Sequence, residues 1–302
     1  MATVAEAIRV EPTGKALGAR IIGVDLRTEN DEARARRMRA ALARHMVLCF
    51  PGQKIEGDDQ IRFARMFGQA DADFVGKPTF NEKVDADGPA KRGILFISNL
   101  KEDGKHVGAL PDGEMHFHSD GAHRKSPYRA TTLYAIKIPS RGGDTLFANL
   151  ADAYDDLPPA MKQRVESIQV HNVYDTRLLV RTATDVSDER VSKAVHPIVR
   201  VHPDSGRRSL YLSRLMTHGI IDMSHNDSEA LLEELFQHIE QPKYIYAHEW
   251  ALDDLLIWDN RSVNHARSDF PANEERHLRR VTVSEPNHRA ERSLHLPGRE
   301  KC

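Results

Sequence analysis

Apolar and polar positions at the start of the chain alternate between helical and strand spacing. Residues 31–45 carry apolar side chains at intervals of three and four, which predicts an amphipathic helix with Asp31 near its start. The run MVLCF at 46–50 is apolar throughout and has the length of a buried strand, and Pro51-Gly52 ends it. This region therefore predicts a helix followed by a strand with two buried faces.

From about residue 93 the pattern changes to short β-rich runs separated by turn residues. Strands at this spacing are typical of a sandwich or barrel rather than of a parallel sheet. The runs lie at 93–99, 131–139, 144–149, 196–203, 208–213, 243–250, 254–260 and 279–285. The sequence therefore predicts a mainly β fold.

Three further segments have helical spacing. Residues 58–68 predict a helix that Asp58 or Asp59 caps and Gly68 closes. Residues 149–168 and 224–241 predict helical insertions among the strands, and Asn226 or Asp227 is the expected N-cap of the second. These helices would cover the β-rich core.

The chain shows no internal repeat and no low-complexity linker, so we expect a single domain over residues 1–302. Residues 286–302 are polar and lack a clear period, which predicts a tail. The 43 basic and 45 acidic residues nearly balance, so no broad field for nucleic acid or an anionic membrane surface is expected. The longest apolar runs have the length of strands and are too short to span a bilayer.

Sulfur is scarce in this chain, which has two cysteines, Cys49 and Cys302. Two thiols so placed do not form a disulfide framework, and the N-terminal residues lack the pattern of a secretory signal, so we expect a cytoplasmic protein. Any metal site must then be built from histidine and carboxylate ligands.

Three His-x-Asp triplets occur in this chain with 16 histidines, whereas chance alone gives roughly one, so context has to separate them. His202-Pro-Asp204 lies between two β-rich runs in turn-forming sequence, which predicts that Asp204 satisfies turn backbone. His225-Asn-Asp227 opens the predicted helix and is better explained by capping.

His118-Ser-Asp120 has no such explanation. In an extended segment both side chains project to one side, so they form either a metal-binding pair or a satisfied polar pair. His265, where a buried-strand pattern ends in a polar turn, is the candidate third ligand. Two histidines and one carboxylate leave open coordination positions and suit Fe(II) oxygenases. Taken alone, a histidine such as His265 is more often a polar core or loop residue than a metal ligand.

Five motifs in order along the chain are similar to those of one known family. Phe117 and Pro51 stand where that family usually has Trp and Arg. The motifs are VLCFPGQ (47–53), FHSD (117–120), PSRGGDTLFANLADAYDDLP (139–158), HPIVRVHPDSGRRSLYL (196–212), and WDNRSVNHARSDF (258–270) followed by RHLRRVTV (276–283). From residue 17 to about residue 283 the chain resembles the TauD/TfdA family of Fe(II)- and 2-oxoglutarate-dependent dioxygenases.

This resemblance implies a double-stranded β-helix, that is, a cupin-like jelly roll with a helical cover, and a set of site residues. It makes His118, Asp120 and His265 the iron ligands. It also places Thr145 and Arg276 at the distal carboxylate of 2-oxoglutarate and Arg280 at an anionic group of the primary substrate. An Arg fork and a Thr hydroxyl suit a carboxylate, whereas the alternatives are a basic edge strand and a glycine turn at Gly142-Gly143.

The expected reaction is hydroxylation of a small anionic substrate by O2, with succinate and CO2 as co-products. The resemblance implies a sulfonate, sulfate ester, aryloxyalkanoate or other carboxylate, and hydroxylation next to a leaving group would cleave a C–S or C–O bond. The loop at residues 69–116 is the part of the family that varies most. We expect a homo-oligomer, a dimer or a tetramer.

Two other classes use the same residues. A zinc hydrolase could bind zinc on the same three ligands, but it would not need a clamp for a diacid. A non-catalytic cupin-like binding protein is the other. Among neighbouring polar residues, Asn260 and Arg261 are expected to be structural or to support the ligands. His106, His116 and His123 are expected at the surface, and His196 in packing.

Overall fold

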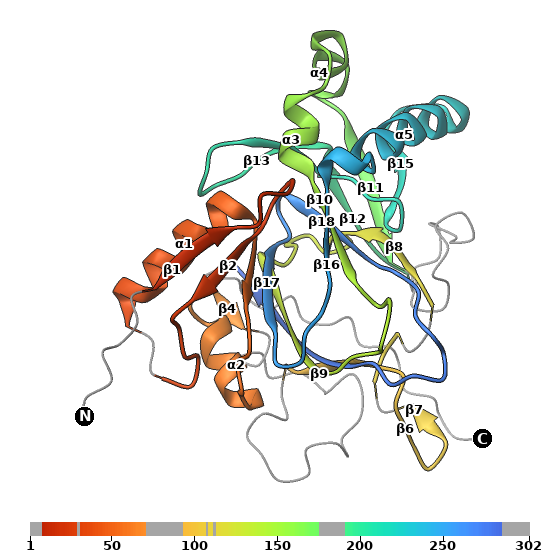
Figure 1. Cartoon of the computed structure of the whole chain (residues 1–302). Helices are drawn as coiled ribbons and strands as arrows, with labels where there is room; N and C mark the ends of the chain where they lie inside the picture. The colour runs from red at the N-terminus through yellow and green to blue at the C-terminus, as the bar shows by residue number, and fades with distance from the viewer. Residues whose placement is uncertain are drawn as a thin grey trace, which may run out of the picture.

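A computed structural model of the chain describes residues 8–28, 31–70, 93–106, 108–110, 113–174 and 191–285. Two β-sheets form its centre, with helices α1 and α2 beside one of them and α3, α4 and α5 gathered at one end (Figure 1). The predicted tail at 286–302 lies outside the described residues, as do residues 71–92 of the loop at 69–116.

The larger sheet has the strand order β1-β2-β3-β17-β9-β19-β4, and β5 pairs with β19. Its strands are antiparallel to their neighbours except that β2 is parallel to β3. They are β1 (Arg9–Pro12), β2 (Ala19–Ile22), β3 (Val47–Phe50), β4 (Gln69–Ala70), β5 (Leu95–Ser98), β9 (Ala130–Lys137), β17 (Leu255–Asp259) and β19 (His277–Ser284).

The second sheet is antiparallel and has the order β16-β10-β18-β8. Its strands are β16 (Ile245–His248), β10 (Thr145–Asn149), β18 (Val263–Arg267) and β8 (Met115–His118). Smaller sheets are formed by β11 (Gln169–Tyr174), β12 (Ser192–Pro197) and β15 (Thr217–Ile220), by β13 (Val199–Val201) and β14 (Arg208–Leu210), and by β6 (Lys101–Glu102) and β7 (Lys105–His106).

Strand alternation explains why the apolar run at 46–50 has no polar face. Leu48 and Phe50 pack in a cluster with helices α1 and α2, whereas Val47 and Cys49 pack on the opposite face of the sheet. That second cluster also contains Phe147 of β10 and Val263 of β18, so it joins the two sheets. Successive side chains of β3 therefore pack into two different hydrophobic clusters, one on each face of the sheet.

Helices α1 (Glu32–His45) and α2 (Gly57–Ala64) pack against the larger sheet. Asp31, which was predicted near the start of this helix, is its N-cap, because its side chain accepts a hydrogen bond from the backbone N–H of Arg34. The caps predicted for α2 are wrong. Glu56 is its N-cap in a capping box, and the helix ends before Gly68.

The helical insertions form a second cluster with α3 (Leu150–Asp155), α4 (Pro159–Val165) and α5 (His225–Ile239). The segment at 149–168 is two helices because Pro158 and Pro159 interrupt the helical hydrogen bonds. Ser224, not Asn226 or Asp227, caps α5.

The mainly β jelly roll with a helical cover is therefore confirmed. None of the helices in the described ranges is long and apolar enough to cross a membrane.

Candidate active site

The register of the second sheet brings the two predicted histidine ligands together. His265 of β18 stands directly opposite His118 of β8, and their ring centroids lie 4.1 Å apart. Asp120 follows β8 by two residues, and its carboxylate oxygens lie 3.9 Å from His118 Nε2 and 3.9 Å from His265 Nε2. One donor atom from each of the three residues lies within 4.8 Å of the others. This spacing fits a single metal ion between them.

Both rings are in the form that binds a metal. His118 Nδ1 lies 2.9 Å from the carbonyl oxygen of His116, which can only accept, so Nδ1 carries the proton and Nε2 keeps its lone pair. Burial lowers the pKa of His118, and burial together with the nearby His118 lowers the pKa of His265 to about 3. Neutral imidazoles are what a metal requires.

Asp120 is held as a carboxylate by two donors. The hydroxyl of Thr131 donates to its Oδ2 at 2.7 Å, and Arg280 NH1 donates to its Oδ1 at 3.2 Å. Burial raises the pKa of Asp120, but the charge of Arg280 and the other neighbours outweigh burial, and the pKa lies below its ordinary value.

Thr145 lies at the start of β10 on the side that carries His265. Phe147 pairs with His265 and Thr145 pairs with Arg267, so all four side chains share one face of the sheet. The indole N–H of Trp250 donates to the Thr145 hydroxyl at 3.1 Å. Because that hydroxyl accepts from Trp250, its own proton is left to point to another acceptor.

Arg276 reaches the turn that precedes Thr145. Its Nε donates to the carbonyl oxygen of Gly143 at 3.1 Å. Gly143 has a φ of 69°, and a Cβ there would lie 3.0 Å from Arg276 Nε, so a larger residue would push the guanidinium away. The glycine turn and the arginine therefore belong to one arrangement.

The guanidinium of Arg276 is buried and has no ion-pair partner among the described residues. Burial, followed by the charge of Arg267, lowers its pKa to about 9, and the more distant carboxylate of Asp144 only partly opposes this shift. Arg267 itself donates to the carbonyls of Leu110 and Gly113. A buried cation in this position is stabilised if an anion binds to it.

A cavity of about 520 Å³ is lined by Phe270, a residue that contacts Arg276. Gly142 and Phe270 line it, and the Phe270 ring faces Arg276 with 5.9 Å between the ring centroid and the guanidinium carbon. Arg141 and Asp269 are its charged lining residues. The cavity therefore approaches the Arg276 region from the protein surface.

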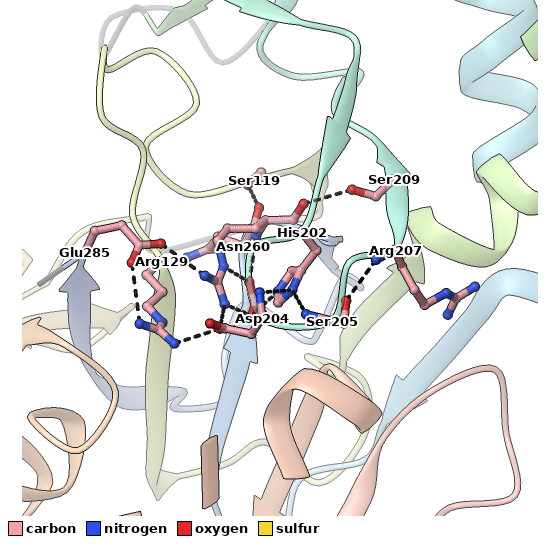
Figure 2. Close-up of polar contacts among 11 residues, drawn as sticks. Ser119, Arg129, His202, Asp204, Ser205, Arg207, Ser209, Asn260 and Glu285 are labelled. Atoms are coloured by element: carbon pink, nitrogen blue, oxygen red, sulfur yellow. Dashed lines mark hydrogen bonds and ion pairs between the residues drawn. The ribbon is translucent and has the colours of Figure 1, made fainter. Parts of the chain in front are cut away.

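The second His-x-Asp triplet forms a different kind of cluster (Figure 2). His202 Nδ1 accepts hydrogen bonds from the backbone N–H groups of Asp204 and Ser205, and its Nε2 lies 2.9 Å from Asp259. The prediction that Asp204 satisfies turn backbone is wrong. Its carboxylate instead accepts from Arg129 and Arg261, at 2.8 Å each.

The other predicted side-chain environments are mixed. His116 is exposed, and His196 packs against Tyr211 and hydrogen-bonds the Arg124 carbonyl, both as expected. His123 was predicted at the surface, but it is half-buried and stacks on Tyr174 with 5.1 Å between ring centroids.

Two polar neighbours of the site were missed in the sequence. Thr131 contacts Asp120, and Trp250 contacts Thr145. Thr131 lies on the same face of β9 as Leu133 and Ala135, which pack between the two sheets. This position in the alternation of the strand is the signal in the sequence that could have identified it.

A jelly roll that brings two histidines and one carboxylate together is typical of the non-haem oxygenases. The family model described as "Taurine catabolism dioxygenase TauD, TfdA family" matches residues 9–282. The chain belongs to this family.

Individual relatives agree with that result. The chain is 30% identical over 283 residues to pentalenolactone F synthase of Streptomyces arenae, covering 89% of this chain and 92% of the relative. It is 32% identical over 246 residues to the alpha-ketoglutarate-dependent 2,4-dichlorophenoxyacetate dioxygenase of Burkholderia sp. (strain RASC), covering 78% and 81%.

A solved structure has the same fold over almost the whole chain. The crystal structure of AAD-2 in complex with Mn(II) and N-oxalylglycine superposes with a TM-score of 0.75 at 29% identity, covering 92% of this chain and 97% of that one. The predicted class of enzyme, a 2-oxoglutarate-dependent dioxygenase, is confirmed, and the zinc hydrolase and the non-catalytic binding protein are set aside.

Proposed function

We propose that the protein binds Fe(II) through His118, Asp120 and His265 and uses it to hydroxylate a small anionic substrate. The observation that carries this proposal is the convergence of the three donor groups within 4.8 Å, with both imidazoles neutral and the carboxylate charged. When bound, iron together with 2-oxoglutarate and O2 supplies the oxidising power, and succinate and CO2 are the co-products.

Thr145 and Arg276 are the proposed clamp for the distal carboxylate of 2-oxoglutarate. The Trp250 indole fills the acceptor position of the Thr145 hydroxyl, so the hydroxyl proton is available for a carboxylate oxygen. The guanidinium of Arg276 is buried beside Gly143 and would gain a charge-assisted pair from such an anion. The N-oxalylglycine bound by AAD-2 is a diacid, which suits a clamp of this kind.

Arg280 is the proposed partner of the primary substrate. Its guanidinium contacts Asp120 and is 22% exposed, so it lies beside the proposed metal and is still accessible. An anionic group of the substrate placed there would bring a neighbouring C–H bond close to the metal. The substrate of the Burkholderia relative, 2,4-dichlorophenoxyacetate, carries a carboxylate and supports an anion at this position.

Succinate release tests the function. The purified protein should form succinate from 2-oxoglutarate only with Fe(II), O2 and a suitable primary substrate, in a panel of aryloxyalkanoates, sulfate esters and sulfonates. Succinate yield should match hydroxylated or cleaved product one to one. Turnover of a panel member without Fe(II) and 2-oxoglutarate would contradict the proposal.

We also propose a cytoplasmic location and assembly into a homo-oligomer. Cys49 is buried as a free thiol, and burial raises its pKa to about 12, which fits a reducing cytoplasm. The single domain and the homo-oligomer stay predictions. Limited proteolysis and light scattering after size-exclusion chromatography test them.

A further inference from the structure

Asn260 is a fully buried amide between β17 and β18, and both ends of the amide are engaged. Trp258 Nε1 donates to Asn260 Oδ1 at 3.0 Å, and Asn260 Nδ2 donates to the Thr131 hydroxyl at 2.9 Å. An indole N–H can only donate, so the amide has one possible orientation.

That orientation fixes the direction of the next hydrogen bond. Because the Thr131 hydroxyl accepts from Asn260, its single proton is free for Asp120, to which it donates at 2.7 Å. A proton directed at Oδ2 restrains the rotation of the Asp120 carboxylate, which the proposed metal needs in one position. Asn260 therefore acts on the carboxylate through Thr131.

The same residue reaches the two histidines by other contacts. The Ser119 hydroxyl donates to the backbone carbonyl of Asn260 at 2.6 Å, and Ser119 stands between His118 and Asp120 in the chain (Figure 2). The Trp258 ring, which Asn260 anchors, packs against His265 with 4.6 Å between centroids. The surroundings of all three proposed ligands therefore meet at one residue, through its side-chain amide and its backbone carbonyl.

We propose that Asn260, acting through Thr131, is a positioning residue that holds the three ligand groups in their metal-binding arrangement. The inference rests on the proposed metal site. Groups that hydrogen-bond to metal ligands typically contribute 10- to 100-fold to metal affinity or activity.

Titration with Mn(II), read from the electron paramagnetic resonance of the free ion, tests this without turnover. Asn260→Asp keeps the shape of the side chain but cannot donate, so the Thr131 proton would turn toward residue 260 and leave Asp120. Thr131→Val removes the hydroxyl directly. Both variants should bind Mn(II) about 10- to 100-fold more weakly than wild type, and Thr131→Ser should restore most of the affinity.

Thr132→Val is the matched control. Thr132 is the next residue of β9, is equally buried, and donates to the Val281 carbonyl on the side away from the ligands. This variant should lose stability but keep wild-type Mn(II) affinity, measured below the melting temperature of every variant.

Two results separate the possible failures. Wild-type affinity in both Asn260→Asp and Thr131→Val, or an equal loss in Thr132→Val, would overturn the positioning role while leaving the metal site standing. A wild-type protein that binds no Mn(II) and no Fe(II) would overturn the proposed metal site, and the positioning role with it.

Discussion

Two His-x-Asp triplets in this chain fold into clusters of nearly the same composition and opposite chemistry. His118, Asp120 and His265 form one, and His202, Asp204 and Asp259 form the other, each with donor atoms within 4.8 Å of one another. Proximity of ligand types alone therefore does not distinguish a metal site from a structural network.

The direction of the hydrogen bonds distinguishes them. His118 gives its Nδ1 proton to a carbonyl and keeps a lone pair on Nε2, which stands 3.9 Å from Asp120, beyond hydrogen-bond distance. His202 accepts two backbone N–H groups on Nδ1, so Nε2 carries the proton and donates it to Asp259. The first cluster leaves lone pairs facing a shared space, and the second uses them.

The neighbouring charges reinforce this difference. Arg261 contacts both Asp204 and Asp259, and Arg129 adds a second guanidinium on Asp204. Burial raises the pKa of Asp259, but hydrogen bonds from Arg261 and His202 outweigh it and hold the pKa below its ordinary value. A metal ion would have to displace these guanidinium groups, so the second cluster stabilises the fold instead.

The largest expected effect is loss of a proposed ligand. His118→Ala and His265→Ala should each weaken Fe(II) binding more than about 100-fold, because removing a ligand costs more than removing a group that supports one. Anaerobic equilibrium dialysis measures the affinity. Retention of one tightly bound iron per chain in either variant would show that the ligands lie elsewhere.

His202→Ala should have the opposite profile. It leaves Asp259 short of one donor and two backbone N–H groups without their acceptor, which should lower the free energy of unfolding by about 2–4 kcal/mol. Iron affinity should stay within about two-fold of wild type, because the metal is proposed to bind at the other cluster. Urea denaturation and dialysis on the same sample separate the two readouts.

Arg276 and Arg280 serve as controls for each other. Arg276→Ala should raise the KM for 2-oxoglutarate about 10- to 100-fold, because this factor corresponds to the free energy of a charge-assisted hydrogen bond. The KM for the primary substrate should change less. Arg280→Ala should show the reverse. If the two profiles are exchanged, the roles of the two arginines have been assigned the wrong way round.

Acid pH should produce the smallest effect, through His123. Burial, followed by the charge of Arg124, lowers the pKa of His123 from its ordinary value of 6.5 to about 4, and the charge of Asp120 opposes this shift. The ring stacks on Tyr174. The unfolded chain therefore takes up this proton first as the pH falls. The stability that this group contributes is complete above about pH 6.5 and decreases toward pH 4.

At about pH 5 the loss from His123 should be about 2 kcal/mol in the metal-free protein. His123→Phe keeps a ring against Tyr174 and removes the titrating group, so its unfolding free energy should depend less steeply on pH. Equal pH dependence in wild type and variant would mean that His123 does not contribute to acid destabilisation.

Much of the fold could be predicted from the sequence because its signals are local. The helix behind Asp31 and the two-faced strand at 47–50 follow from periodicity over a few residues. The errors in the predicted helices lie at their ends, where Glu56 and Ser224 are the N-caps in place of the nearby residues that were predicted.

Less of the candidate site than of the fold could be predicted from the sequence. Sequence motifs select His118 over His202, but only the fold shows why, because the local backbone path gives His118 Nδ1 a carbonyl to donate to and gives His202 Nδ1 two N–H groups to accept from. Thr131 is 129 residues from Asn260 in the chain, and no local pattern links them. Contacts of that separation depend on the register of β9 against β17.

The most direct test of the contrast between the two clusters is an anomalous difference map at the iron edge from crystals grown with Fe(II) and without oxygen. One peak per chain is expected, at bonding distance from the Nε2 atoms of His118 and His265 and from the Asp120 carboxylate. A peak between His202 and Asp259, or no peak at His118, would contradict it.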